Sequence, residues 1–208
     1  MMSSWQIGPT LPWLDLAGIA LFALTGALAA ARCGQTIVTM AFFALITGVG
    51  GGTVRDLLIG APVFWVQDGR VAAICLATAV IVWIAPSRAW DWRALDWLDA
   101  IGLAAYAVFG AAKALGFGVP PVPAALMGII TACVGGIIRD VLAGEPSILL
   151  RPELYVTAAA LAAALFVGLT VAGIAAPIAA PVAAVSGFAL RALAIVKGLK
   201  LPGFGRRR

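Results

Sequence analysis

Long apolar runs separated by short polar, Pro- or Gly-bearing segments account for most of the chain. Each run is close to the roughly 20 residues that an α-helix needs to cross a bilayer. The length and continuity of the runs therefore predict transmembrane helices. The expected spans are 13–31, 36–59, 70–86, 97–115, 120–143, 152–174 and 176–196.

The composition supports a membrane protein of the all-α class. Hydrophobic residues make up 63% of the chain, charged residues 11%, and the mean hydropathy is +1.07. A water-soluble domain of this length needs a charged shell that such a chain lacks. The absence of histidine argues against a zinc or haem site. Cys33, Cys75 and Cys133 form no CxxC pair, and we expect buried, inert thiols.

The distribution of Lys and Arg predicts the orientation. With the N-terminus outside and the C-terminus in the cytoplasm, the outer side carries only Arg70 and Lys113, as the positive-inside rule requires. The net charge of +5 comes mostly from the C-terminal end. We interpret the basic tail, 197–208 with Arg191 before it, as a cytoplasmic anchor rather than a nucleic-acid site. The remaining inner-side residues are Arg32, Arg88, Arg93 and Arg151, and the Trp residues expected at the membrane interface are Trp83, Trp90, Trp92 and Trp97.

An internal repeat appears when the chain is compared with itself, because 14–62 overlays 98–146 without a gap. The clearest match is GG-x-x-RD-x-L-x-G-x-P, which begins at Gly51 and again at Gly135. Each copy contains an odd number of spans, so the second must enter the membrane inverted relative to the first. We predict one membrane domain over 1–208. It would consist of repeat 1 at 13–86 (helices 1–3), repeat 2 at 97–174 (helices 4–6), a seventh helix at 176–196 and the tail.

Glycine clusters interrupt the second and fifth spans near their middle, at Gly50–Gly52 and at Gly135–Gly136. Each glycine costs a helix about 1 kcal/mol relative to alanine, so the clusters predict a bend or a break. The alternative is close helix packing, for which Gly48-x-x-x-Gly52 is a typical pattern. A break would expose backbone groups that favour ions or polar solutes near the membrane centre.

An Arg-Asp pair follows each glycine cluster, at Arg55-Asp56 and at Arg139-Asp140. The helical rise places each pair only about 5–7 Å from the membrane centre. Charges at that depth must face a polar cavity or one another. A structural ion pair between the second and fifth spans is the alternative. Thr47 lies one turn before the first cluster and Thr131 before the second, where a hydroxyl can line a pore or bond back to its helix.

The remaining polar residues have simpler interpretations. We interpret Asp15 and Asp99 as helix N-caps, and Lys113 as a side chain that extends to the membrane surface. Glu145 and Glu153 are isolated loop carboxylates. No nucleophile or phosphate-binding motif is present, so we expect neither an enzyme nor a cofactor.

The paired GG-x-x-RD motifs, each followed by G-x-P, resemble the prokaryotic members of the trimeric intracellular cation channel family. The resemblance covers nearly the whole chain. It implies a homotrimer in which each subunit has its own pathway for K⁺ and Na⁺, lined by the glycine-bent second and fifth helices. The Lys-Glu-Val motif that holds a phosphoinositide in animal members is absent. The same repeat also occurs in bacterial proteins described as glycine transporters.

Three functions therefore compete: a monovalent cation channel, a transporter of glycine or another small zwitterion, and a scaffold whose Arg-Asp pairs only stabilise the fold. For the channel we expect a homotrimer in the cell (inner) membrane, in contact with lipid and without nucleic acid. The expected pore and gating residues are Thr47, Gly50, Gly51, Gly52, Arg55, Asp56, Thr131, Gly135, Gly136, Arg139 and Asp140.

Overall fold

The computed structural model describes residues 11–85, 93–150 and 153–202. Several residues used to predict the orientation and the interface belt lie outside these ranges, so the orientation stays a prediction. They are Arg88, Trp90, Trp92, Arg151 and Arg206 to Arg208. Of the other two Trp residues, Trp83 is exposed. The second, Trp97, has its ring 6.3 Å from that of Phe188.

The described residues fold into α-helices, with a single isolated β-bridge between Glu153 and Lys200. This confirms the all-α prediction. Helices occupy all the expected runs, and their ends lie within four residues of the expected positions. The helices are α1 (Leu11–Arg32), α2 (Ile37–Leu58), α3 (Phe64–Gln67), α4 (Gly69–Ile84), α5 (Ala94–Gly116), α6 (Pro121–Ala143), the 3₁₀ turn η2 (Ile148–Leu150), α7 (Val156–Val171) and α8 (Ala176–Lys197).

Five of these helices are long and apolar enough to cross a membrane, and they are α1, α2, α5, α6 and α8. The helices α4 and α7 are apolar but shorter, with 16 residues each. Both occupy the third position of a repeat, and their crossing of the membrane stays a prediction. The chain is therefore a multi-pass membrane protein, because several of its helices need an apolar solvent around them.

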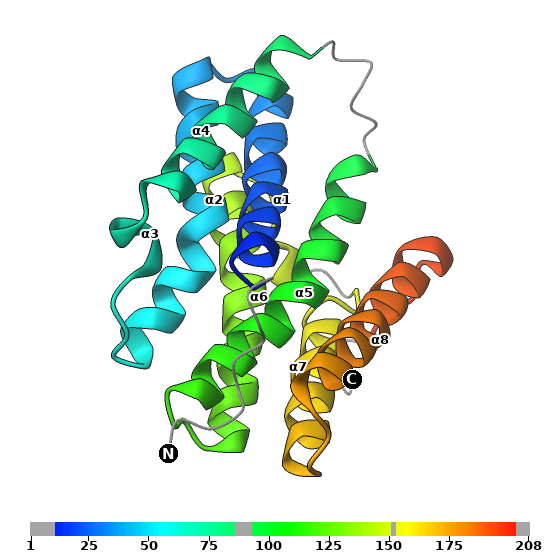
Figure 1. Cartoon of the computed structure of the whole chain (residues 1–208). Helices are drawn as coiled ribbons and strands as arrows, with labels where there is room; N and C mark the ends of the chain where they lie inside the picture. The colour runs from blue at the N-terminus through cyan, green and yellow to red at the C-terminus, as the bar shows by residue number, and fades with distance from the viewer. Residues whose placement is uncertain (1–10, 86–92, 151–152, 203–208) are drawn as a thin grey trace, which may run out of the picture.

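The helices form two bundles (Figure 1). One bundle contains α1, α2 and α4, which contact one another, and the other contains α5, α6, α7 and α8. The bundles meet where α2 crosses α6 and where α1 packs against α5 and α6. A Cβ atom added at Gly51 would collide with the Thr131 carbonyl, and one added at Gly135 would lie 2.5 Å from the Thr47 carbonyl. Gly51 of α2 therefore lies against Thr131 of α6, and Gly135 of α6 lies against Thr47 of α2, so the chain runs in opposite directions along the two helices. The two helices are therefore antiparallel, as an inverted repeat requires.

The glycine clusters do not break their helices. Both α2 and α6 are continuous α-helices through Gly50–Gly52 and Gly135–Gly136. The expectation of half-helix termini at the membrane centre is therefore wrong for this conformation. The physical reason is the crossing itself, because bare backbone at Gly51 and Gly135 lets the other helix approach where a Cβ would not fit. Close packing offsets the intrinsic cost of glycine in a helix.

The C-terminal helix is attached through a buried ion pair. The Arg191 guanidinium is 1% exposed, donates to Glu153 at 2.8 Å and lies over the Tyr155 ring, 5.4 Å from its centroid. Two predictions are therefore wrong. Glu153 is not an isolated carboxylate, and Arg191 is not part of a basic tail. Its buried charge instead fixes α8 to the segment before α7.

Candidate functional site

The first Arg-Asp pair closes the C-terminal end of α2. Arg55 folds onto the carboxylate of its neighbour, with Nε and Nη2 at 2.9 and 2.8 Å from Asp56 Oδ1. The helix ends at Leu58, and Gly60 adopts a φ of +68° that reverses the chain. The chain then returns so that the backbone N–H of Phe64 donates to Asp56 Oδ2 at 3.1 Å. Both carboxylate oxygens are thereby occupied.

The second pair repeats this arrangement in the second copy of the repeat. Arg139 donates to Asp140 Oδ1 from Nε at 3.0 Å and from Nη2 at 2.9 Å. Gly144 has a φ of +70°, and the backbone N–H of Ile148 donates to Asp140 Oδ2 at 2.7 Å. The motif is therefore first a local fold, in which the glycine turns the chain and the carboxylate receives the returning backbone. Each pair lies within one helix, so the alternative interpretation, an ion pair between the second and fifth spans, is wrong.

The two clusters differ in what surrounds the arginine. Arg139 also donates from Nη1 to Asp99 Oδ1 at 2.7 Å and to Thr25 Oγ1 at 3.1 Å. It therefore links α6 to α5 and α1. Asp99 lies inside α5, which begins at Ala94, and is 1% exposed. Its interpretation as a helix cap is wrong, because it is a buried partner of a buried guanidinium.

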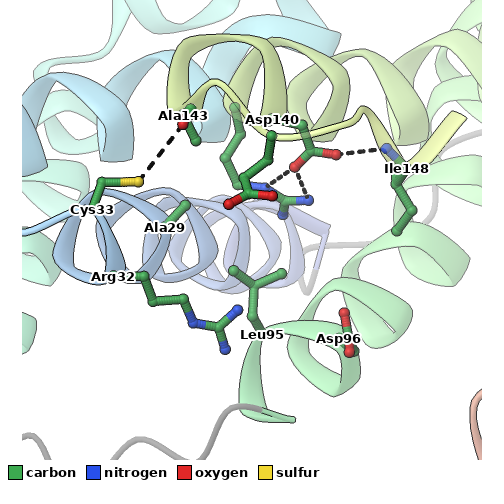
Figure 2. A pocket seen from close by; sticks show the side chains of 10 residues that line it. Ala29, Arg32, Cys33, Leu95, Asp96, Asp140, Ala143 and Ile148 are labelled. Carbon is green, nitrogen blue, oxygen red and sulfur yellow. Dashed lines mark hydrogen bonds and ion pairs between the residues drawn. The ribbon is translucent and has the colours of Figure 1, made fainter. Parts of the chain in front are cut away.

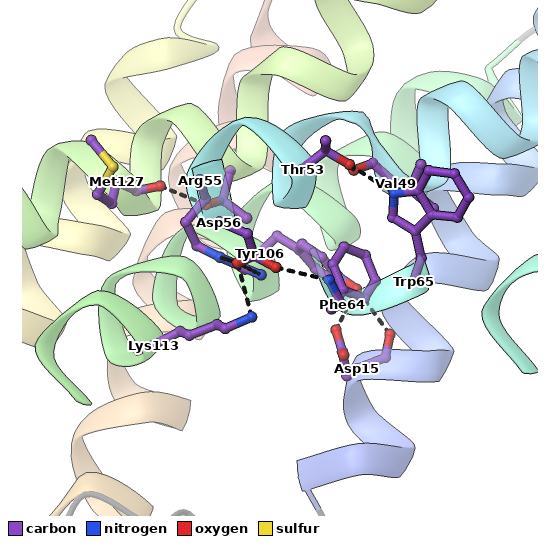
Figure 3. Close-up of polar contacts among 11 residues, drawn as sticks. Asp15, Val49, Thr53, Arg55, Asp56, Phe64, Trp65, Tyr106, Lys113 and Met127 are labelled. Carbon is purple, nitrogen blue, oxygen red and sulfur yellow. Dashed lines mark hydrogen bonds and ion pairs between the residues drawn. The ribbon is translucent and has the colours of Figure 1, made fainter. Parts of the chain in front are cut away.

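In the first cluster the corresponding positions behave differently (Figure 3). Asp15, the equivalent of Asp99, lies within α1 rather than at its cap and accepts a hydrogen bond of 2.8 Å from the Tyr106 hydroxyl. Arg55 instead lies over aromatic rings, 5.4 Å from the centroid of Phe109 and 5.9 Å from that of Phe64. Cation–π contacts thus replace the second carboxylate.

Lys113 completes the first cluster. Its ammonium group lies 2.8 Å from Asp56 Oδ1, and its side chain is 22% exposed. The prediction that it extends to the membrane surface is therefore wrong. Asp56 is held by two cations, whereas in the second cluster two carboxylates hold Arg139. The excess charge thus has opposite sign at the two pairs.

Between the clusters, the α2–α6 crossing forms a constriction. Its small internal space holds no water-sized sphere. The Thr131 hydroxyl donates back to the Met127 carbonyl at 2.6 Å, whereas that of Thr47 has no hydrogen-bond partner among the described residues. The residues that line this space include both predicted threonines and three of the predicted glycines, namely Phe22, Thr47, Gly48, Gly51, Gly52, Tyr106, Thr131 and Gly135.

The other predicted glycines lie beside the constriction. An added Cβ at Gly50 would meet only the tip of the Ile138 side chain, at 3.0 Å, apart from one ordinary van der Waals contact with Gly135 Cα. At Gly136 it would meet the Tyr155 hydroxyl at 2.9 Å. Gly136 therefore leaves space for a residue that sequence reasoning did not identify. No local pattern marks Tyr155, because it comes to this point from the segment before α7.

A cavity of about 250 Å³ opens beside the second cluster (Figure 2). Arg139 and Asp140 line it and also contact each other, which agrees with the prediction for the second pair. Three carboxylates and two guanidinium groups line it together with small and apolar residues. Cys33 is exposed here, so the expectation of a buried thiol holds for Cys75 and Cys133 but not for Cys33. The lining residues are Ala29, Arg32, Cys33, Leu95, Asp96, Arg139, Asp140, Ala143, Glu145 and Ile148.

Comparison with protein families gives two matches to one model. The model described as "Glycine transporter" matches residues 12–87 and again 96–171. Among curated proteins, the chain is 39% identical to the UPF0126 inner membrane protein YadS of Escherichia coli K12 over 153 residues. The match covers 72% of this chain and 73% of YadS.

Two solved structures share this fold over nearly their whole length. The TRIC trimeric intracellular cation channel orthologue from Rhodobacter sphaeroides has 44% identity and a TM-score of 0.85, with 91% of this chain and 100% of that chain covered. A prokaryotic TRIC channel studied in 0.5 M KCl has 27% identity and a TM-score of 0.83, with 92% and 98% covered.

Proposed function

This chain carries two copies of the glycine-transporter family domain and belongs to the family of the prokaryotic TRIC channels, and we propose that it is a monovalent cation channel. The sequence likeness to a TRIC cation channel over its full length supports a channel. In this proposal the chain forms a homotrimer in the cell membrane with the N-terminus outside. Each subunit has its own pathway for K⁺ and Na⁺ and performs no catalysis.

The observation that carries this proposal is the order of polar groups along α2 and α6. The crossing is centred between Thr47 and Gly51, and the helical rise places Arg55-Asp56 about 9 Å further along α2. Because α6 is antiparallel, Arg139-Asp140 lies at a similar distance on the opposite side. Charged groups inside a membrane protein typically mark an ion pathway. Here one Arg-Asp pair lies on each side of the constriction at the α2–α6 crossing.

The constriction makes this conformation closed, because a space without room for water cannot pass a cation. In our proposal the channel opens when α2 and α6 separate or bend at their glycines. The opposite excess charges of the two clusters offset one another along the pathway, which predicts weak discrimination between K⁺ and Na⁺. Replacing Gly135 and Gly136 together by alanine should therefore alter opening, and unchanged single-channel currents would contradict this gating scheme.

The direct test is cation flux into proteoliposomes. Purified protein should carry K⁺ and Na⁺ down their gradients at rates that do not saturate at low concentration, whereas protein-free vesicles should stay tight. Valinomycin added at the end reports the total vesicle volume that K⁺ can reach. Vesicles with folded protein but no flux above the protein-free level would refute the channel.

The family description favours a second candidate, a carrier for glycine or a similar zwitterion. In that function a buried Arg would hold the carboxylate group and a neighbouring Asp the ammonium group. Saturable uptake of labelled glycine, without unitary currents in a bilayer, would favour the carrier over the channel. Folded protein with neither activity would leave the scaffold, in which the Arg-Asp pairs only stabilise the fold.

A further inference from the structure

The internal repeat permits a comparison of what faces each buried aspartate. Asp56 Oδ1 accepts from Arg55 and from the Lys113 ammonium group, both at 2.8 Å. Asp140 Oδ1 accepts from Arg139 in the same way. In the overlay of the two copies, the residue at the position of Lys113 is Ala29. The second cluster therefore has the same carboxylate without the ammonium group.

The space left by that difference is the cavity of about 250 Å³, which both Ala29 and Asp140 line (Figure 2). Its volume equals the share of about eight water molecules in liquid water, enough for a cation with part of its hydration shell. Two further differences favour a cation. Glu145 lines the cavity where the first repeat has Ala61, and the small Cys33 stands where the second repeat has Phe117. Arg32 also lines the cavity, where the second repeat has Gly116, but the three carboxylates of the lining still outnumber its two guanidinium groups.

The charges of the second cluster also call for a cation. Arg139 is 1% exposed and is shared between two carboxylates, those of Asp99 and Asp140. Asp99 lies behind Arg139 and does not line the cavity, but its Oδ2 is buried and has no hydrogen-bond partner among the described residues. A buried carboxylate in excess of its cationic partners is costly unless a counter-ion joins it. In the first cluster Lys113 gives Asp56 a second cationic partner that is covalently attached.

We propose that the cavity between Ala29 and Asp140 binds one monovalent cation per subunit, at the place that the Lys113 ammonium group occupies in the other half. This inference rests on the proposed cation pathway, for which it supplies a binding site on one side of the constriction. The first half carries a fixed cation and the second half an exchangeable one. With the site occupied, Asp140 has two cationic partners, as Asp56 has in the first cluster.

The test measures cation binding as thermal stability of the purified protein, with KCl replacing choline chloride at constant chloride. Binding to the folded state alone raises the Tm as the ligand concentration rises. Wild type should therefore gain stability in KCl. Ala29→Lys should raise the Tm in choline chloride and weaken the apparent K⁺ affinity by more than about tenfold, since a tethered ammonium competes at a high effective concentration.

Ala29→Met is the matched control, because it adds a chain of similar length without charge. It should leave the Tm in choline chloride at or below that of wild type. Lys113→Ala is a second, independent variant, because it should create a vacant place at Asp56 and make the Tm depend more steeply on KCl. Size-exclusion chromatography checks that each variant is folded.

Two results would overturn the site: equal wild-type Tm in KCl and choline chloride, or unchanged KCl dependence in Ala29→Lys. Proteoliposome flux measured on the same preparations separates this failure from that of the channel. Flux without KCl-dependent stability would refute the cation site and support the channel. KCl-dependent stability without flux would support the cation site and refute the channel.

Discussion

The two Arg-Asp clusters share one local fold and have opposite surroundings. In both, the arginine folds onto the next residue and a backbone N–H returns to the second carboxylate oxygen. Around Arg55 there are two aromatic rings and a second cation. Around Arg139 there are a second carboxylate and a hydroxyl. The motif therefore determines the turn, and residues from other helices determine the charge.

This difference shows how an inverted repeat can build an asymmetric pathway. On the side with Lys113 a covalently attached ammonium group lies on Asp56, and on the side with Ala29 there is a cavity. Both sides meet at the same glycine crossing. If the account is correct, equivalent substitutions in the two halves should have unequal effects.

The largest difference is expected when each arginine is removed. Arg139→Met leaves Asp99 and Asp140 buried without their cation, which should lower the free energy of unfolding by about 3–5 kcal/mol. Arg55→Met leaves Asp56 paired with Lys113 and should cost less, about 1–3 kcal/mol. SDS-induced unfolding in mixed micelles measures both.

A double substitution controls for lost packing. Adding Asp99→Asn to Arg139→Met removes one uncompensated charge and should restore part of the stability. Equal costs for the two arginines, or no recovery in the double variant, would mean that the charge balance of the two clusters is the same.

The crossing should respond to single methyl groups in a position-specific way. Gly51→Ala directs its Cβ at the Thr131 carbonyl, a backbone atom that cannot rotate away, and should cost about 1–3 kcal/mol through overpacking. Gly50→Ala, one residue earlier, meets chiefly the flexible tip of Ile138 and should be close to neutral. Unfolding of both variants under identical conditions makes the comparison. Similar stabilities would contradict the close approach of α2 and α6.

The smallest difference is expected at two buried hydroxyls. Tyr106→Phe removes the hydrogen bond to Asp15 and should cost about 1 kcal/mol. Tyr155→Phe removes a hydroxyl that faces Asp99 without a well-formed hydrogen bond, so it should cost less stability than Tyr106→Phe. A larger loss at Tyr155 than at Tyr106 would show that its hydroxyl has a partner in the membrane-embedded protein.

The fold could be predicted from the sequence because its main features are local. Apolar runs of membrane length positioned the helices, and the internal repeat identified the equivalence of Asp56 and Asp140. The same kind of local signal gave a wrong prediction at the glycine clusters, where a helix break was expected. A glycine cluster weakens an isolated helix. Here the close packing of α2 against α6 at Gly51 and Gly135 offsets that loss of stability, and both helices stay continuous.

The partners of the charged residues could not be predicted, because they come from distant segments. Asp99 has the position of a helix cap by sequence, yet α5 already begins at Ala94, so Asp99 lies within the helix and meets Arg139. For the same reason Lys113 was predicted to extend to the membrane surface and Glu153 to be isolated. Their partners, Asp56 and Arg191, follow only from the packing of helices.

The central claim, that cations pass between α2 and α6 and the two charged clusters, is tested most directly by recording from purified protein in a planar bilayer under a KCl gradient. The account predicts unitary currents that reverse near the equilibrium potential of K⁺ and that continue when Na⁺ replaces K⁺. Absence of unitary currents from folded protein, or currents that reverse near the Cl⁻ potential, would contradict it.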